Sequence, residues 1–131
     1  MTSLPKRVGV LWMSLMILAL PALAADAPKV LNVLTVKVKG DQTAYLQRVQ
    51  QIMAIQKRLE TGATTRVWRA TVAGQETGTI YVGIEYANLE AYAKAATKLQ
   101  ADDEFNKVQK ELQTGGLREL ISNSQLVEIT P

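Results

Sequence analysis

The spacing of apolar residues divides the chain into segments of two different periods. Val30 to Lys39 is rich in aliphatic residues and alternates with polar ones in its second half, which predicts a β-strand that ends at Gly40. In the segment that follows, apolar side chains recur every three or four residues, which is typical of an amphipathic helix. We expect Asp41 to cap this helix and Gly62 to follow its end.

The second half of the chain repeats the change from strand to helix. Thr65 to Ala73 and Thr79 to Tyr86 alternate around a glycine-bounded turn and predict a β-hairpin. Asn88 is expected to cap a second helical stretch, which breaks at Ala101-Asp102 and then resumes. Gln125 to Thr130 predicts the last strand. The order β-α-β-β-α-β favours an α+β, ferredoxin-like fold: a four-stranded antiparallel sheet with both helical segments on one face.

An acidic triplet, Asp102 to Glu104, begins the resumed helix. Carboxylates stabilise the positive end of a helix, and they can also bind a cation. Because three successive side chains splay around a helical turn, we favour capping, and we expect no metal site.

The hairpin gathers unusual side chains on one face. If Ala73 faces Gly78, alternation places Arg66, Trp68, Tyr81 and Glu85 together, with Trp68 opposite Gly83 and Arg66 opposite Glu85 as a charge pair. The opposite face is aliphatic and is expected to pack on the helices. The mixed face therefore needs a separate explanation.

A second copy of the chain is the cover that we expect for this mixed face. The helices are already used on the other side, and an exposed tryptophan and tyrosine would form a patch that monomers rarely keep. We therefore predict a homodimer in which two sheets face each other. The space between them is the candidate ligand site, lined by Arg66, Trp68, Tyr81 and Glu85, with Lys37 added from the first strand.

The first 24 residues have the features of a cleaved signal peptide. Lys6 and Arg7 precede an uncharged apolar run, Val8 to Leu20, and Ala22-Leu23-Ala24 forms a cleavage signal. The run is shorter than the roughly 20 residues of a membrane-spanning helix. An uncleaved anchor is the alternative. Cleavage would leave residues 25–131 as one periplasmic or secreted domain without a membrane span.

Composition excludes several classes of function. Loss of the leader lowers the formal charge from +3 to +1, which removes the electrostatic basis for binding nucleic acid. The chain contains no cysteine and no histidine. It therefore lacks disulfides, the histidine-dependent catalytic triads, the usual zinc ligand and the usual proximal haem ligand. We expect no cofactor.

The segment RVWRATVAGQETGTIYVGIEYANLEAYAKAATKL, followed by QADDEFNKV, resembles the dimeric α/β-barrel superfamily. Within it, the chain is similar to small NIPSNAP-type and antibiotic-biosynthesis-monooxygenase-type domains. The features that carry the resemblance are Tyr86 at a strand end, Asn88 before an alanine-rich helix, and the acidic turn before Phe105. The resemblance implies ferredoxin-like protomers that dimerise through their sheets. The superfamily also includes haem enzymes, but this chain has no histidine to match their proximal ligand.

Two classes of function follow. The first is a small-molecule-binding or scaffold module of the cell envelope, with an aromatic or anionic ligand. The second, drawn from the resemblance, is a cofactor-independent monooxygenase acting on an aromatic or quinol-type substrate, with Glu85 as base and Tyr81 as hydrogen-bond donor. Arg66 beside Glu85 would keep that carboxylate ionised and make it a poor base, so we favour binding. Each of these side chains could instead serve packing alone.

Overall fold

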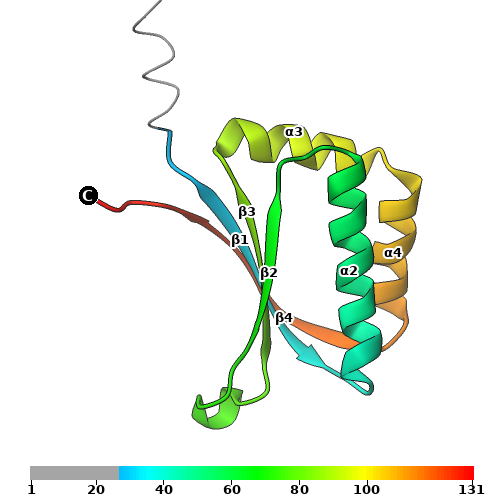
Figure 1. Ribbon diagram of the computed structural model, residues 1–131. Helices are drawn as coiled ribbons and strands as arrows, with labels where there is room; N and C mark the ends of the chain where they lie inside the picture. Colours follow the sequence, from blue (N-terminus) through cyan, green and yellow to red (C-terminus); the bar gives the residue numbers. More distant parts are fainter. Residues whose placement is uncertain (1–26) are drawn as a thin grey trace, which may run out of the picture.

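The computed structural model describes residues 27–131; the predicted leader and its cleavage site lie outside the described residues. Its helices and strands are labelled as in Figure 1. In chain order they are β1 (Val30–Val38), α2 (Gln42–Arg58), β2 (Thr64–Arg69), the 3-10 turn η1 (Gly74–Glu76), β3 (Ile80–Tyr86), α3 (Leu89–Gln100), α4 (Asp103–Thr114) and β4 (Arg118–Val127).

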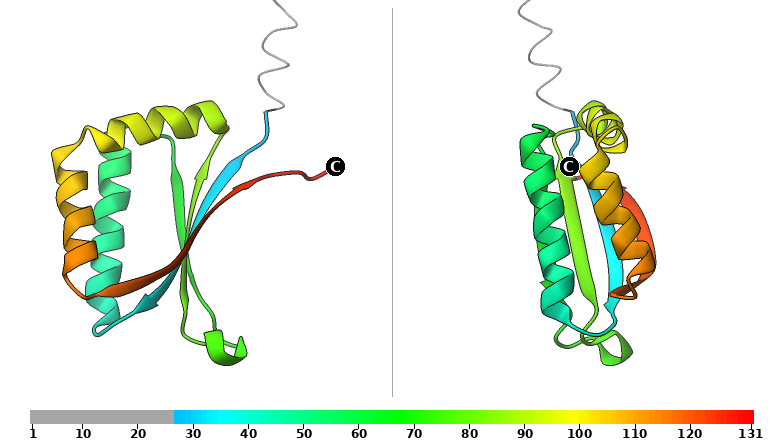
Figure 2. Two further views of the ribbon diagram at one scale, coloured as in Figure 1. Left: turned by 180° about the vertical axis from the view of Figure 1, so that it is seen from behind. Right: turned by 90° about the vertical axis from the view of Figure 1, so that its right-hand side faces the viewer.

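The four strands form one antiparallel sheet in the order β2-β3-β1-β4, and α2, α3 and α4 all lie on one side of it (Figures 1 and 2). The predicted fold class is thus confirmed, with three helices because the second helical stretch divides at Ala101-Asp102. Within residues 27–131, no helix is both long and apolar enough to cross a bilayer.

Each α-helix begins at a side chain that satisfies a free backbone N–H group. Asp41 accepts a hydrogen bond from the Thr43 amide, and Asn88 accepts one from the Ala91 amide at 2.8 Å. Asp102 does the same for Phe105 at 2.9 Å and also pairs with Arg58 at the end of α2. The Phe105 amide and then Arg58 hold the pKa of Asp102 below its ordinary value. The acidic triplet therefore acts as a helix start, as predicted.

Alternation along β1 and β3 separates the two faces of the sheet. Their even-numbered residues face the helices, and Val36 and Val82 among them are almost completely buried. They join side chains from the three helices in one core. Its buried members are Val36, Tyr45, Val49, Ile55, Ile80, Val82, Leu99, Val108 and Leu112.

The hairpin register differs from the predicted one by two residues. Trp68 lies opposite Tyr81, and Arg66 lies opposite Gly83. The predicted pairing of Arg66 with Glu85 is therefore wrong. The reason is the turn: η1 and its flanks occupy Ala70 to Thr79, so the connection is longer than the four-residue loop that we expected. A shift of two residues keeps every side chain on its predicted face.

The last strand also differs from prediction. It spans Arg118–Val127, whereas the expected strand ran from Gln125 to Thr130. β4 is an edge strand, and its second half extends beyond the helices (Figure 1). It contains a register shift opposite Thr35/Val36, which interrupts the alternation along the strand. An exposed, irregular edge strand carries little of the apolar alternation by which strands are recognised.

Candidate functional site

The predicted site residues share the sheet face opposite the helices, which we call the open face. The strand register places there Arg66 and Trp68 from β2, Tyr81 and Glu85 from β3, and Lys37 from β1. They do not all converge at one point of this face. Glu85 pairs with Leu31, which lies six positions before Lys37 on β1, a distance of about 20 Å along the strand.

Most of these side chains have partners other than each other. Glu85 forms an ion pair with Lys29 at 3.5 Å, and the Tyr81 hydroxyl donates to Glu76 at 3.2 Å. Trp68 is half-exposed, and its ring lies directly over Gly83, where a Cβ atom would be 2.6 Å from the indole. The predicted stacking of Trp68 on Gly83 is thus present although the register differs. Within residues 27–131, no carboxylate lies within ion-pair distance of Arg66.

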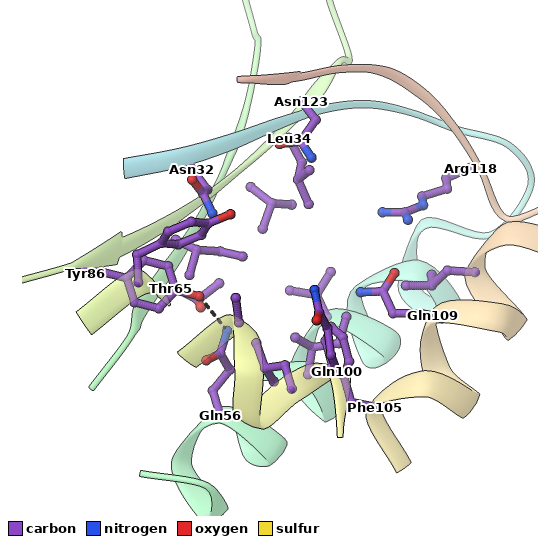
Figure 3. Close-up of a pocket in the computed structure, with 18 of the residues that line it drawn as sticks. Asn32, Leu34, Gln56, Thr65, Tyr86, Gln100, Phe105, Gln109, Arg118 and Asn123 are labelled. Atoms are coloured by element: carbon purple, nitrogen blue, oxygen red, sulfur yellow. Dashed lines mark hydrogen bonds between the residues drawn. The ribbon is translucent and has the colours of Figure 1, made fainter. Parts of the chain in front are cut away.

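A cavity of about 240 Å³ lies on the other side of the sheet, between the strands and the three helices (Figure 3). Every strand and every α-helix contributes to its wall. The lining is aromatic and aliphatic, with several amide side chains: Asn32, Leu34, Tyr45, Val49, Ile52, Gln56, Thr65, Val82, Ile84, Tyr86, Tyr92, Ala96, Leu99, Gln100, Phe105, Gln109, Leu112, Arg118 and Asn123. This combination is typical of a small-molecule site.

Two tyrosines form the end of the cavity near β2. Tyr86 and Tyr92 contact each other edge to face, with ring centres 5.4 Å apart and planes at 74°. The buried Gln56 amide donates to the Tyr86 hydroxyl at 3.4 Å, and Thr61 donates to the carbonyl oxygen of that amide. Burial raises the pKa of Tyr86. The Tyr86 ring is therefore held in place by hydrogen bonds that run from Thr61 through Gln56 to its hydroxyl.

Arg118 occupies the opposite end. It is the first residue of β4, and Figure 3 shows its guanidinium directed into the cavity near Gln109. It lies close enough to the hydroxyl of Tyr45 to influence its ionisation. Burial raises the pKa of Tyr45, and Arg118 offsets part of this effect, so the phenol stays protonated at neutral pH.

The charge balance of the cavity is simple. Arg118 is the only lining residue that is charged at neutral pH. Glu111, on the nearby helix α4, is paired with Arg48 at 2.9 Å. Among the described residues, no carboxylate is within ion-pair distance of Arg118. Across residues 27–131, no group of three or more acidic, histidine or cysteine side chains has the geometry to hold a metal ion.

The sequence analysis did not find this cavity. Its polar walls are glutamines and asparagines, which look like ordinary solvent-facing helix residues, and Arg118 lay in a stretch assigned to no element. One signal was available. Asn32 interrupts an aliphatic strand, and on the helix-facing side of a sheet a polar residue needs a partner or a cavity.

Solved structures show which proteins share this fold. A NIPSNAP family protein of unknown function from Agrobacterium tumefaciens strain C58 matches with a TM-score of 0.61 and 18% identity, covering 81% of this chain and 95% of that chain. A second NIPSNAP family protein from the same strain has a TM-score of 0.58 and 16% identity, over 79% and 93% of the two chains. This chain has a NIPSNAP-like, ferredoxin-like fold. The predicted resemblance is confirmed at that level.

A NIPSNAP-like domain protein from Burkholderia xenovorans is a further match, with a TM-score of 0.55, 11% identity, and coverage of 79% of this chain and 85% of that chain. No protein-family model and no curated protein matches the sequence. These structural matches show a NIPSNAP-like fold, but at such low sequence identity no residue role can be transferred from them to this chain. The function must be argued from the cavity itself.

Proposed function

We propose that this protein is a small-molecule-binding module whose site is the cavity between the sheet and the helices. The observation that carries the proposal is the composition of that cavity: aromatic and aliphatic walls, several amides and one cation without a carboxylate partner in the described chain. A purely structural core would be filled by aliphatic side chains and would not place a guanidinium in a hollow.

The cellular compartment that we propose for the protein is based on its leader. Residues 1–24 have the pattern of a signal peptide, so we place the working domain in the periplasm or outside the cell. Such a module would capture its ligand from a dilute exterior. A preformed cavity suits that task, because little ordering is needed on binding.

A pair of alanines on α3 provides the test. Ala96 lines the cavity and Ala93 is exposed on the same helix. We expect Ala96→Phe to fill the cavity and to abolish the binding of small aromatic probes, measured by calorimetry and by thermal stabilisation. Ala93→Phe should bind as the wild type does. Circular dichroism spectra that match between the two variants would show that both are folded.

Two results would contradict the proposal. One is that no aromatic probe, acidic, neutral or basic, binds the wild-type protein. The other is that probes bind equally well to Ala96→Phe, which would place their site elsewhere on the molecule.

We also propose that the open face pairs with a second copy of the chain. Trp68 and Leu126 are each about half exposed there, at 49% and 51%, and Leu31 lies between their strands. A sheet-to-sheet dimer would cover them. The five open-face residues would then line the space between protomers, as the sequence analysis expected, and would form a second, shared site only where the sheets leave room.

The monooxygenase alternative has less support. Such an enzyme needs a base close to its substrate. The lining of the cavity includes no carboxylate, and the chain has no histidine. Glu85 lies on the open face and is paired with Lys29. Binding without catalysis is therefore the function that we favour.

A further inference from the structure

We infer that the ligand of the cavity is an aromatic monocarboxylate, with its carboxylate at Arg118 and its ring toward Tyr86. This inference rests on the proposed function, because it names the class of molecule that the same cavity would select. Three features of the cavity support it: its charge, its length and the donors at its Arg118 end.

The charge selects an anion. Arg118 is the only charged group in the lining, and Glu111, the nearby acid on α4, is already paired with Arg48. A cationic ligand would be repelled by the guanidinium, and a neutral one would leave it without a counter-charge. An anion would satisfy it in an environment where water screens the attraction less than on the surface. Arginine also matches a carboxylate geometrically, through two parallel N–H···O hydrogen bonds.

The single guanidinium of the lining favours a ligand with one negative charge. A phosphate monoester carries close to two at neutral pH, and it is normally met by several cations or by a helix N-terminus. The lining offers one guanidinium only. Neutral donors close to it, the protonated hydroxyl of Tyr45 and the amide of Gln109, suit the second oxygen of a carboxylate.

The length of the cavity favours a ligand with distinct ends. Arg118 pairs with Val38 at one end of β1, whereas Tyr86 pairs with Val30 at the other. Figure 3 shows the two side chains at opposite sides of the cavity. The Tyr86 end is aromatic and carries the Tyr86–Tyr92 pair, which offers an edge and a face to a ligand ring. The amides between the ends could meet ring hydroxyls.

The test uses three probes that share a 2-(4-hydroxyphenyl)ethyl group and differ only in the group at its end: 3-(4-hydroxyphenyl)propanoate, its primary amide, and tyramine as the cation. They are titrated calorimetrically into the wild-type protein and into Arg118→Gln. Arg69→Gln is the matched control, because this arginine is exposed at the end of β2 and lines none of the cavity. Thermal unfolding of each unliganded variant checks that it is folded.

We expect the carboxylate to bind the wild type at least tenfold more tightly than the amide, and tyramine to bind more weakly than either. Arg118→Gln should lose the preference for the acid while keeping affinity for the amide, and Arg69→Gln should keep the preference. Equal binding of acid and amide to the wild type would overturn the inference and leave the proposed function standing. The same holds if Arg118→Gln retains the preference. If no probe binds the wild type, both fall together.

Discussion

The two faces of the sheet use similar side chains in opposite ways. On the helix-facing side, Tyr45 and Tyr86 are buried, Tyr86 is hydrogen-bonded to Gln56, and the single cation of the cavity has no acidic partner in the described chain. On the open face, Trp68 is half-exposed, and Lys29 and Glu85 form an ion pair. Charges that are already paired leave little for a ligand to satisfy. Arg66 on the open face also has no carboxylate partner in the described residues, but it is exposed to water, so the less exposed Arg118 in the cavity is the better candidate for binding a ligand.

Trp68 illustrates the same contrast. A tryptophan on a mixed strand face is a conspicuous feature in a sequence, yet here its ring lies over Gly83 and lines none of the cavity. Its place fits an interface between protomers. The fluorescence of this residue, the only tryptophan outside the leader, should therefore report on dimerisation and not on ligand entry.

Two leucines give the largest expected difference between the faces. Leu112 is buried at 1% exposure against the helix-facing side, and Leu126 is half-exposed on the open face. Leu112→Ala should lower the free energy of unfolding by roughly 2–5 kcal/mol, because it leaves a hole in the core. Leu126→Ala should cost well under about 1 kcal/mol in a monomer. Urea denaturation at low protein concentration measures both, and equal losses would contradict the separation into one packed and one open face.

The fold could be predicted from the sequence because its strands and helices carry strong local patterns. Alternation in β1 and β3 and the caps Asp41, Asn88 and Asp102 were all identified, and the structure confirms them. The cavity was missed for the converse reason. A hollow depends on side chains that are far apart in the chain, and Gln109 or Arg118 has no local pattern that marks it as inward-facing.

Charge on the open face should control self-association. We expect the wild type to sediment as a dimer at micromolar concentration, and Trp68→Lys to raise the dissociation constant at least about tenfold, because a lysine would be buried between two sheets. Val72→Lys is the control, since Val72 is 96% exposed in the hairpin connection, beyond the end of β2. Analytical ultracentrifugation distinguishes the two. A wild type that sediments as a monomer would refute the dimer.

The tyrosines of the two faces should respond differently to alkali. Burial raises the pKa of Tyr45 and Tyr86 above the ordinary value of 10.0, so the unfolded chain loses these protons first as the pH rises. The free energy of unfolding should be insensitive to them below about pH 9 and should fall above pH 10, by at most about 1.4 kcal/mol per pH unit for each tyrosine.

Single substitutions apportion this alkaline loss. Tyr45→Phe removes the titrating group and keeps the ring, so the decline above pH 10 should become shallower. Burial and then Glu76 also raise the pKa of Tyr81 on the open face. This side chain is only partly buried, so water screens the effect and Tyr81→Phe should alter the slope less. Unfolding curves between pH 8 and pH 11 provide the measurement. An unchanged slope in Tyr45→Phe would show that its hydroxyl is not buried.

The smallest effect is expected from Glu85. Glu85→Gln removes an ion pair whose two side chains are 60% and 34% exposed, so it should change the free energy of unfolding by less than about 0.5 kcal/mol. The variant should also bind aromatic probes as the wild type does, because Glu85 lies on the face away from the cavity. Oxygen consumption with quinols, measured in parallel, separates this expectation from the oxygenase alternative. Turnover in the wild type that disappears in Glu85→Gln would move the functional site to the open face.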